Sequence, residues 1–156
     1  MTAGVAEKID AMARLGFMLG RWRGIGWTVL ERGRVEFEQQ EVVRSRLSGE
    51  ILTVEGSAND PGHPDDVRFT AFAIATYDPD THSYRWRAYS AGSCVEVALE
   101  VDDRSYRWEF EAAPGVQMRF HGTVGTDLWH ETGHASHDGG DSWSHTFEMN
   151  LTRLRP

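Results

Sequence analysis

Cysteine is almost absent from this sequence: its 156 residues include one, Cys94. A single cysteine excludes an internal disulfide, which fits a reducing compartment. Long apolar runs are also missing, since no stretch approaches the roughly 20 residues that a membrane-spanning helix needs. Residues 1–8 lack a basic segment followed by an apolar one, so the sequence predicts no signal peptide. We therefore expect a cytoplasmic protein with no membrane partner.

Runs of lysine or arginine are absent as well. The chain carries 16 Lys and Arg against 24 Asp and Glu, a net charge of -8. This balance disfavours nucleic acid as a partner, because nucleic acid attracts basic patches. The length suits a single barrel domain spanning residues 1–156, and a small molecule is the expected partner. The sequence leaves open whether the chain forms a homodimer.

Aromatic residues, in contrast, are abundant: six Trp, four Tyr and seven Phe. These residue types suit both strands and the walls of pockets. Helical spacing occurs only in residues 5–15, where Val5, Ile9 and Met12 recur. A helix this short must pack on another element to be stable. After Gly20 the apolar period changes to two, which is typical of strands.

Turn signals divide the rest of the chain into segments of about ten residues. They lie at residues 32–33, 48–49, 59–62, 78–80, 91–92, 102–103, 114–115, 125–126 and 138–141. This regular spacing predicts an all-β fold, an antiparallel up-and-down ten-stranded β-barrel with a short N-terminal helix. We expect the helix to lie across one end of the barrel.

Short hairpin loops fix which residues lie opposite each other, so one inward residue sets the register of its neighbours. With Trp22 pointing inward, Gln39 and Glu41 point inward as well. Past the longer loop near Pro61 we set the register from the most apolar face. An aromatic wall then lines the lumen, formed by Tyr84, Trp86, Tyr106, Trp108 and Phe110.

The strand after residues 114–115 gives two conflicting answers. Loop counting points one set of side chains inward: Gln117, Arg119 and His121. The apolar alternation favours the opposite set: Val116, Met118 and Phe120. A bulge or a different turn length would exchange the two faces. Following loop counting through the next hairpins, we expect a polar wall of Arg119, His121, His130, His134 and His145.

Neutral imidazoles on one surface bind zinc, copper or haem iron. His130 and His134 lie roughly 13 Å apart along one strand, too far to share an ion. A metal would need a cross-strand pair, either His121 with His130 or His134 with His145. The spacing does not predict a structural zinc site. A polar pocket wall or solvated strand ends would explain the same histidines.

Arg119 has three interpretations: it clamps a ligand carboxylate, pairs with Glu41 inside the barrel, or points outward. Glu41 beside His130 suggests acid–base chemistry such as isomerisation or cyclisation. No nucleophile–base spacing supports an enzyme, so we assign no catalytic residue.

A group of known barrels shares several of these features. The motif Gly20-Arg21-Trp22 follows a short helix, and Arg153 lies near the end of the last strand. This arrangement resembles the calycins, which include lipocalins and fatty-acid-binding proteins. In lipocalins a late arginine packs over the tryptophan of Gly-x-Trp. The resemblance implies a barrel with a cavity, and it implies a structural contact of Arg153 with Trp22.

Residues 19–26 also resemble the opening of nitrobindin, a haem-binding barrel. That likeness implies haem as a candidate cofactor, held by one late histidine that the sequence does not single out. The turn at residues 77–79 and the ending at residues 149–153 are similar to an uncharacterised bacterial calycin-like family. We therefore expect a barrel that binds a small hydrophobic or amphipathic ligand. The alternatives are haem or metal binding and an isomerase- or cyclase-like enzyme.

Overall fold

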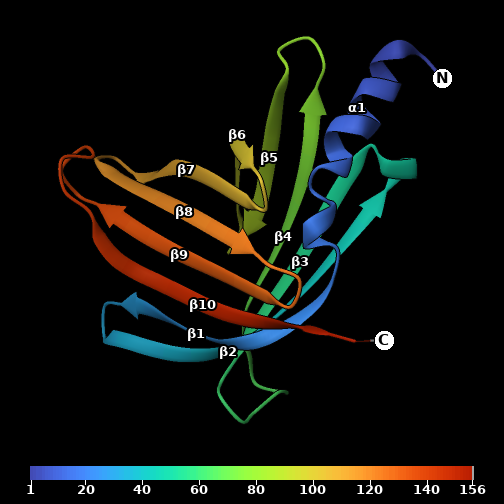
Figure 1. Cartoon of the computed structure of the whole chain (residues 1–156). Coiled ribbons are helices and arrows are strands. Elements are labelled where there is room, and N and C mark those ends of the chain that lie inside the picture. The colour runs from blue at the N-terminus through green and yellow to red at the C-terminus, as the bar shows by residue number, and fades with distance from the viewer. Residues whose placement is uncertain (156) are drawn as a thin grey trace.

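Ten antiparallel strands form a closed barrel in the computed structural model, which describes residues 1–155. Each strand pairs with its neighbours in sequence, and the first strand closes on the last (Figure 1). The strands are β1 (Gly20–Leu30), β2 (Gly33–Arg46), β3 (Ile51–Asn59), β4 (Val67–Asp78), β5 (Ser83–Ser90), β6 (Ser93–Asp102), β7 (Ser105–Ala113), β8 (Val116–Val124), β9 (Leu128–Ser136) and β10 (Ser144–Leu154). The expected up-and-down barrel is confirmed.

One α-helix, α1 (Ala3–Ala13), precedes the barrel, and two short 3₁₀ helices follow, η1 (Gly16–Met18) and η2 (Leu47–Gly49). The Thr2 hydroxyl accepts a hydrogen bond from the Val5 amide at 3.2 Å, which caps the start of α1. None of the helices among residues 1–155 has the length and apolar character needed to cross a bilayer.

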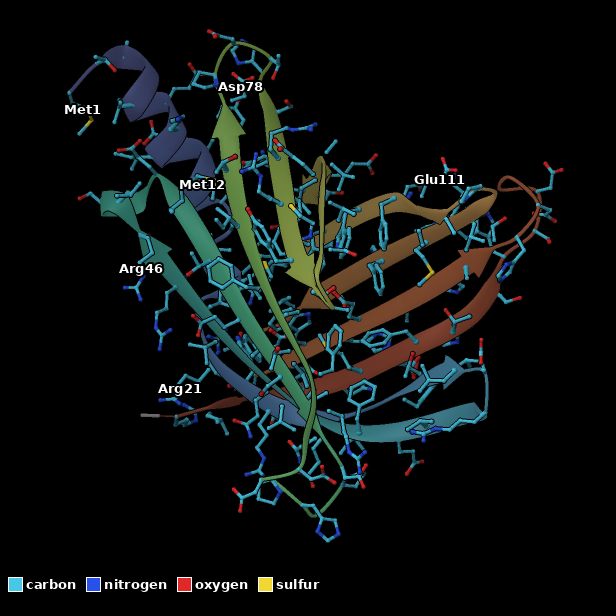
Figure 2. All side chains as sticks on the ribbon, turned by 180° about the vertical axis from the view of Figure 1, so that it is seen from behind. Met1, Met12, Arg21, Arg46, Asp78 and Glu111 are labelled. Atoms are coloured by element: carbon cyan, nitrogen blue, oxygen red, sulfur yellow. The ribbon has the colours of Figure 1, made fainter. Side chains whose placement is uncertain are left out.

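The helix α1 packs against one end of the barrel, as expected. Met12 is buried there, and the Tyr84 hydroxyl of β5 donates to the carbonyl of Ala11 at 2.7 Å. The same carbonyl also accepts the Arg14 amide at 3.2 Å, so the Tyr84 bond ties the capped C-terminal end of α1 to β5. Figure 2 shows Met12 on the same side of the barrel as Asp78, with Glu111 on the opposite side.

Trp22 seals this end of the barrel. Its side chain is fully buried, and its indole N–H donates to the carbonyl of Met18 at 3.0 Å. The Arg153 guanidinium lies 4.0 Å from the centre of the Trp22 ring and donates to the carbonyls of Phe17 and Leu19. The structural contact between Trp22 and Arg153 is confirmed, and it ties β1, β10 and η1 together.

Burial of the inward side chains decreases along most strands away from Trp22. Near α1 the inward residues are buried, including Trp22, Val43, Leu52, Ala75, Tyr84, Leu99, Tyr106, Val124, Trp129 and Leu151. Toward the other end they become half-buried, including Phe37, Ala88, Val97, Trp108, Phe110, Met118, Phe120 and Phe147. The barrel therefore has a packed floor under α1 and an opposite end that solvent reaches, which we call the mouth.

The register of β8 differs from the one that loop counting predicts. Trp108 lies opposite Phe120, so Met118 and Phe120 point inward, and Arg119 points outward. The cause is a bulge in β7 between Glu111 and Ala113, directly before the turn. One extra residue exchanges the two faces of the following strand. The apolar alternation therefore predicts this strand correctly.

Pairing between β6 and β7 is much shorter than the other ladders. It comprises three residue pairs within residues 1–155, Glu100–Arg107, Val101–Tyr106 and Asp102–Ser105. Toward the mouth the two strands diverge, and residues 93–99 of β6 pair with none of the described residues on their β7 side. The barrel is therefore closed only near its floor along this seam.

We expect hydrogen exchange to reveal this seam. Amides of residues 93–99 that point toward β7 lack a cross-strand acceptor, so they should exchange at least about ten-fold faster than amides in the middle of β9. Exchange measured by NMR on the folded protein tests this. If the β7-facing amides of residues 93–99 were protected as well as the amides of β9, the β6–β7 ladder would have to extend beyond three residue pairs.

Candidate functional site

A continuous row of aromatic side chains crosses the inner wall near the mouth. Trp86 on β5 lies 5.8 Å from Trp108 on β7, measured between ring centres. Trp108 stacks on Phe120 of β8 at 4.8 Å, and Phe120 lies 5.7 Å from Phe147 of β10. Phe147 in turn stacks on Phe37 of β2 at 5.8 Å. We call these five residues the aromatic row.

The expected inward placement of the aromatic wall is confirmed for Tyr84, Trp86, Tyr106, Trp108 and Phe110. They do not all have the same surroundings. Tyr84 and Tyr106 belong to the packed floor, whereas Trp108 and Phe110 stack on each other at 5.5 Å and keep partial exposure. Contact of these side chains with a ligand stays a prediction.

A buried carboxyl, that of Glu41, lies on the inner face of β2. The Gln39 amide donates to Glu41 Oε1 at 2.8 Å, while Glu41 Oε2 is buried without a partner among the described residues. Burial raises the pKa of Glu41 to about 8, the Gln39 bond opposes this shift, and the charge of Glu131 adds to it. Gly56 leaves room for this carboxyl, since a Cβ there would lie 2.7 Å from Glu41 Oε1.

A second carboxyl, that of Glu131, points inward from β9. It accepts a hydrogen bond from the Tyr106 hydroxyl, which itself accepts one from the Trp129 indole at 3.0 Å. Burial raises the pKa of Glu131 to about 7, although the Tyr106 bond opposes the shift. Part of the Glu131 side chain stays accessible. Gly122 makes space for Tyr106, because a Cβ at residue 122 would collide with its ring.

The expected polar wall does not line the lumen. Cross-strand pairing places all five of its members on the outer face: Arg119, His121, His130, His134 and His145. The bulge in β7 turns Arg119 and His121 outward, and the same one-residue shift carries through β9. A second bulge between His145 and Phe147 separates the faces of those two residues, so His145 points out and Phe147 points in.

Arg119 follows the third of its three interpretations and points outward. Its guanidinium lies 3.7 Å from the centre of the Trp143 ring and 4.0 Å from a Glu109 carboxylate oxygen. The internal pair with Glu41 and the clamp on a ligand carboxylate inside the barrel are therefore wrong. The pairing of Glu41 with His130 as acid and base is wrong for the same reason, because His130 lies on the outer face.

The outward histidines contact one another and Glu148. His145 lies opposite His134, as loop counting predicts, and the two rings stack at 4.9 Å. Glu148 Oε2 lies 3.5 Å from the Nε2 atoms of both His130 and His145. Burial, followed by the charges of His145 and Arg119, lowers the pKa of His134. No group of three His, Cys, Asp or Glu side chains within residues 1–155 has a geometry that could hold a metal ion.

Haem ligation by a histidine does not fit this lumen. The inward positions of the described strands carry no histidine, and Cys94 is exposed on the outer side of β6. The side chains that nitrobindin-like ligation would require lie on the other face of the sheet. The late histidine that the resemblance to nitrobindin implied as a haem ligand is therefore not found among the inward positions of the described strands.

Two hollows lie outside the lumen. A groove of about 900 Å³ runs over the outer side of β2 to β5 and the β5–β6 turn, where Val42, Phe72 and Tyr89 form its apolar surface. A smaller hollow of about 300 Å³ lies at the short β6–β7 ladder, where it reaches Tyr106 and His121. Neither hollow contains converging chemical groups comparable to Glu41 and Glu131.

Sequence reasoning missed Glu131. The register error after residue 112 assigned its neighbours His130 and Thr132 to the lumen and left Glu131 outside. The signal that would have found it was the apolar alternation of β8, which continues through Gly122 and Val124 to Trp129. Keeping Trp129 inward places Glu131 inward as well.

These features define the class of the protein: a closed, ten-stranded antiparallel β-barrel preceded by one short α-helix. Among solved structures, the chain is similar to the crystal structure of Rv2717c from M. tuberculosis, with a TM-score of 0.69 and 12% identity. That match covers 93% of this chain and 98% of the other. At this identity the likeness shows the fold alone.

A second similar structure is a protein of unknown function from the DUF3598 family of Nostoc punctiforme PCC 73102. Its TM-score is 0.45 at 13% identity, and the match covers 90% of this chain and 48% of that chain. The chain thus spans about half the length of this protein. No protein-family model matches the sequence. No curated protein matches it either.

Proposed function

We propose that the barrel binds a small, largely apolar ligand at its mouth, against the aromatic row. The observation that carries this proposal is the partial exposure of Trp108, Phe120, Phe147 and Phe37, four inward-facing members of the row. Water-exposed aromatic surface inside a barrel is released from water by a ligand, which favours binding. The short β6–β7 seam beside Trp108 offers a route of entry.

A neutral fluorescent probe, N-phenyl-1-naphthylamine, tests this site. We expect its fluorescence to rise on binding, and W108L to weaken its affinity at least about ten-fold, because Trp108 contacts Trp86, Phe110 and Phe120. The matched control is W27L, since Trp27 lies on the outer face between Arg34 and His145. Equal affinities of W108L and W27L would contradict a lumen site. Native mass spectrometry of protein from its own host would identify a retained ligand.

Acid–base catalysis in the same lumen is a second candidate. The observation that favours it is the pair of inward carboxyls, whose pKa values of about 8 and about 7 suit proton transfer near neutral pH. Glu131 replaces His130 as the partner of Glu41 in this hypothesis. An enzyme would lose turnover in E41Q or E131Q while binding of the neutral probe survives.

A further inference from the structure

The two inward carboxyls, those of Glu41 and Glu131, have no free cationic partner among the inward-facing side chains of residues 1–155. Among the inward-facing positions of residues 1–155, the one side chain with a permanent positive charge is that of Arg153. Its guanidinium is already held at the floor by the Trp22 ring and by the carbonyls of Phe17 and Leu19. Ionised Glu41 or Glu131 would therefore be a buried charge without a counterion, which is costly.

The hydrogen bonds of the carboxyls leave capacity for a ligand. At Glu41 one oxygen accepts the Gln39 amide, and the other, Oε2, is buried and unpartnered. At Glu131 the hydroxyl of Tyr106 occupies Oε1, and the side chain keeps some accessible surface. A buried oxygen without a partner, such as Glu41 Oε2, is rare in proteins and calls for one. Once Glu41 ionises, a ligand that donates a hydrogen bond to Oε2 would be that partner.

The aromatic row also favours a positively charged ligand. The face of an aromatic ring is electronegative, so it attracts cations as well as apolar groups. Trp108 lies in the middle of the row and stacks on Phe110 and Phe120. Carboxyl oxygens and ring faces are both complementary to a positively charged group. The overall charge of -8 also favours the approach of a cation.

We propose that the ligand is an organic cation: a protonated amine on an aromatic or aliphatic body, with the ammonium group held by Glu41 and Glu131 and the body packed on the aromatic row. This inference rests on the proposed function, since it specifies the ligand of the same lumen. The unpartnered indole N–H of Trp86 defines the competing ligand, a neutral molecule with an oxygen acceptor.

Three probes that share one ring system separate these ligands. They are 1-naphthylmethylamine, which is an ammonium ion at pH 7, 1-naphthylmethanol and 1-naphthoate. We expect isothermal titration calorimetry to give at least about ten-fold tighter binding for the ammonium ion than for the alcohol, and the weakest binding for naphthoate. Titrations in buffers of different ionisation enthalpy should also show proton release, because the protonated carboxyls must ionise to pair with the ammonium.

Substitution of each carboxyl then assigns the charge. E41Q and E131Q should each weaken ammonium binding about ten-fold or more and reduce proton release, while affinity for the alcohol changes less than about two-fold. The matched control is E36Q, an exposed position on the outer face of the same strand. Two variants are useful because each carboxyl lies in a different hydrogen-bond network, and circular dichroism verifies that each variant folds.

The outcomes of the two proposals are distinguishable. Ammonium and alcohol binding with equal affinity, no ammonium binding, or unchanged proton release in both variants would each overturn the cation proposal. In those cases binding of N-phenyl-1-naphthylamine, with its loss in W108L, still supports a pocket at the aromatic row. Failure of all probes, the neutral ones included, would overturn the proposed function itself.

Discussion

The variant R153M is expected to unfold at a much lower urea concentration than the wild type. Arg153 donates to the carbonyls of Phe17, Leu19 and Thr126, and its guanidinium covers the Trp22 ring. Methionine keeps part of the packing but supplies no donor. The loss of a cation–π contact and of charge-assisted hydrogen bonds should cost roughly 3–5 kcal/mol.

Urea titrations followed by tryptophan fluorescence measure this effect, since Trp22 and Trp129 lie in the floor. The matched control is R155M, two residues along the chain. The Arg155 side chain is 80% exposed and contacts Asp127 at 3.3 Å, so its loss should change stability by less than about 0.5 kcal/mol. Similar midpoints for R153M and R155M would show that the arginine over Trp22 contributes little to the floor.

The second large effect is the pH dependence of E41Q. Folding raises the pKa of Glu41 from 4.5 to about 8 through burial. The folded chain therefore holds this proton more tightly than the unfolded chain. As the pH rises from 4.5 to about 8, the unfolded chain ionises first and the folded state loses stability. At about 1.4 kcal/mol per pH unit, the loss amounts to roughly 5 kcal/mol at pH 8.

Glutamine at residue 41 removes this ionisation and keeps an oxygen for the Gln39 amide. We expect E41Q to be as stable as the wild type near pH 4.5 and more stable by several kcal/mol near pH 8.5. Glu131 contributes a slope of the same sign up to about pH 7 in both proteins. The difference between the two urea titrations at each pH isolates Glu41. A difference that stays constant with pH would contradict the raised pKa of Glu41.

Much of the barrel could be predicted from local pattern. Trp22 sets the register of β1 and β2, and the most apolar face sets that of β4 and β5, where Ala75 lies opposite Trp86. Each of these assignments depends on side chains a few residues apart. The closing contact of Arg153 with Trp22 was implied by the resemblance to lipocalins, and an even number of strands allows the last strand to pair antiparallel with the first.

The candidate site could be predicted only in part, because two bulges change the parity of the last strands. A bulge adds one residue to one strand. In β7 that residue is Ala112, next to Ala113, where two alanines give no apolar–polar alternation that would reveal it. The bulge before Pro114 reversed the faces of β8 and β9, so four outward side chains there were assigned to the lumen and Glu131 was not. His145 of β10 was misassigned with them, because it lies opposite His134. In β8 the apolar alternation of Met118 and Phe120 predicted the inward face better than loop counting did, because burial of apolar side chains determines which face of a strand points into the barrel.

The short ladder between β6 and β7 leaves two strand edges with free backbone amides and carbonyls. Such edges are templates on which a strand from another molecule adds, the first step of aggregation. Glutamates line the outer face of both strands, with Glu96 and Glu100 on β6 and Glu109 and Glu111 on β7. Like charges on an incoming copy oppose such addition, so we expect the seam that we propose as a route of entry to resist self-association.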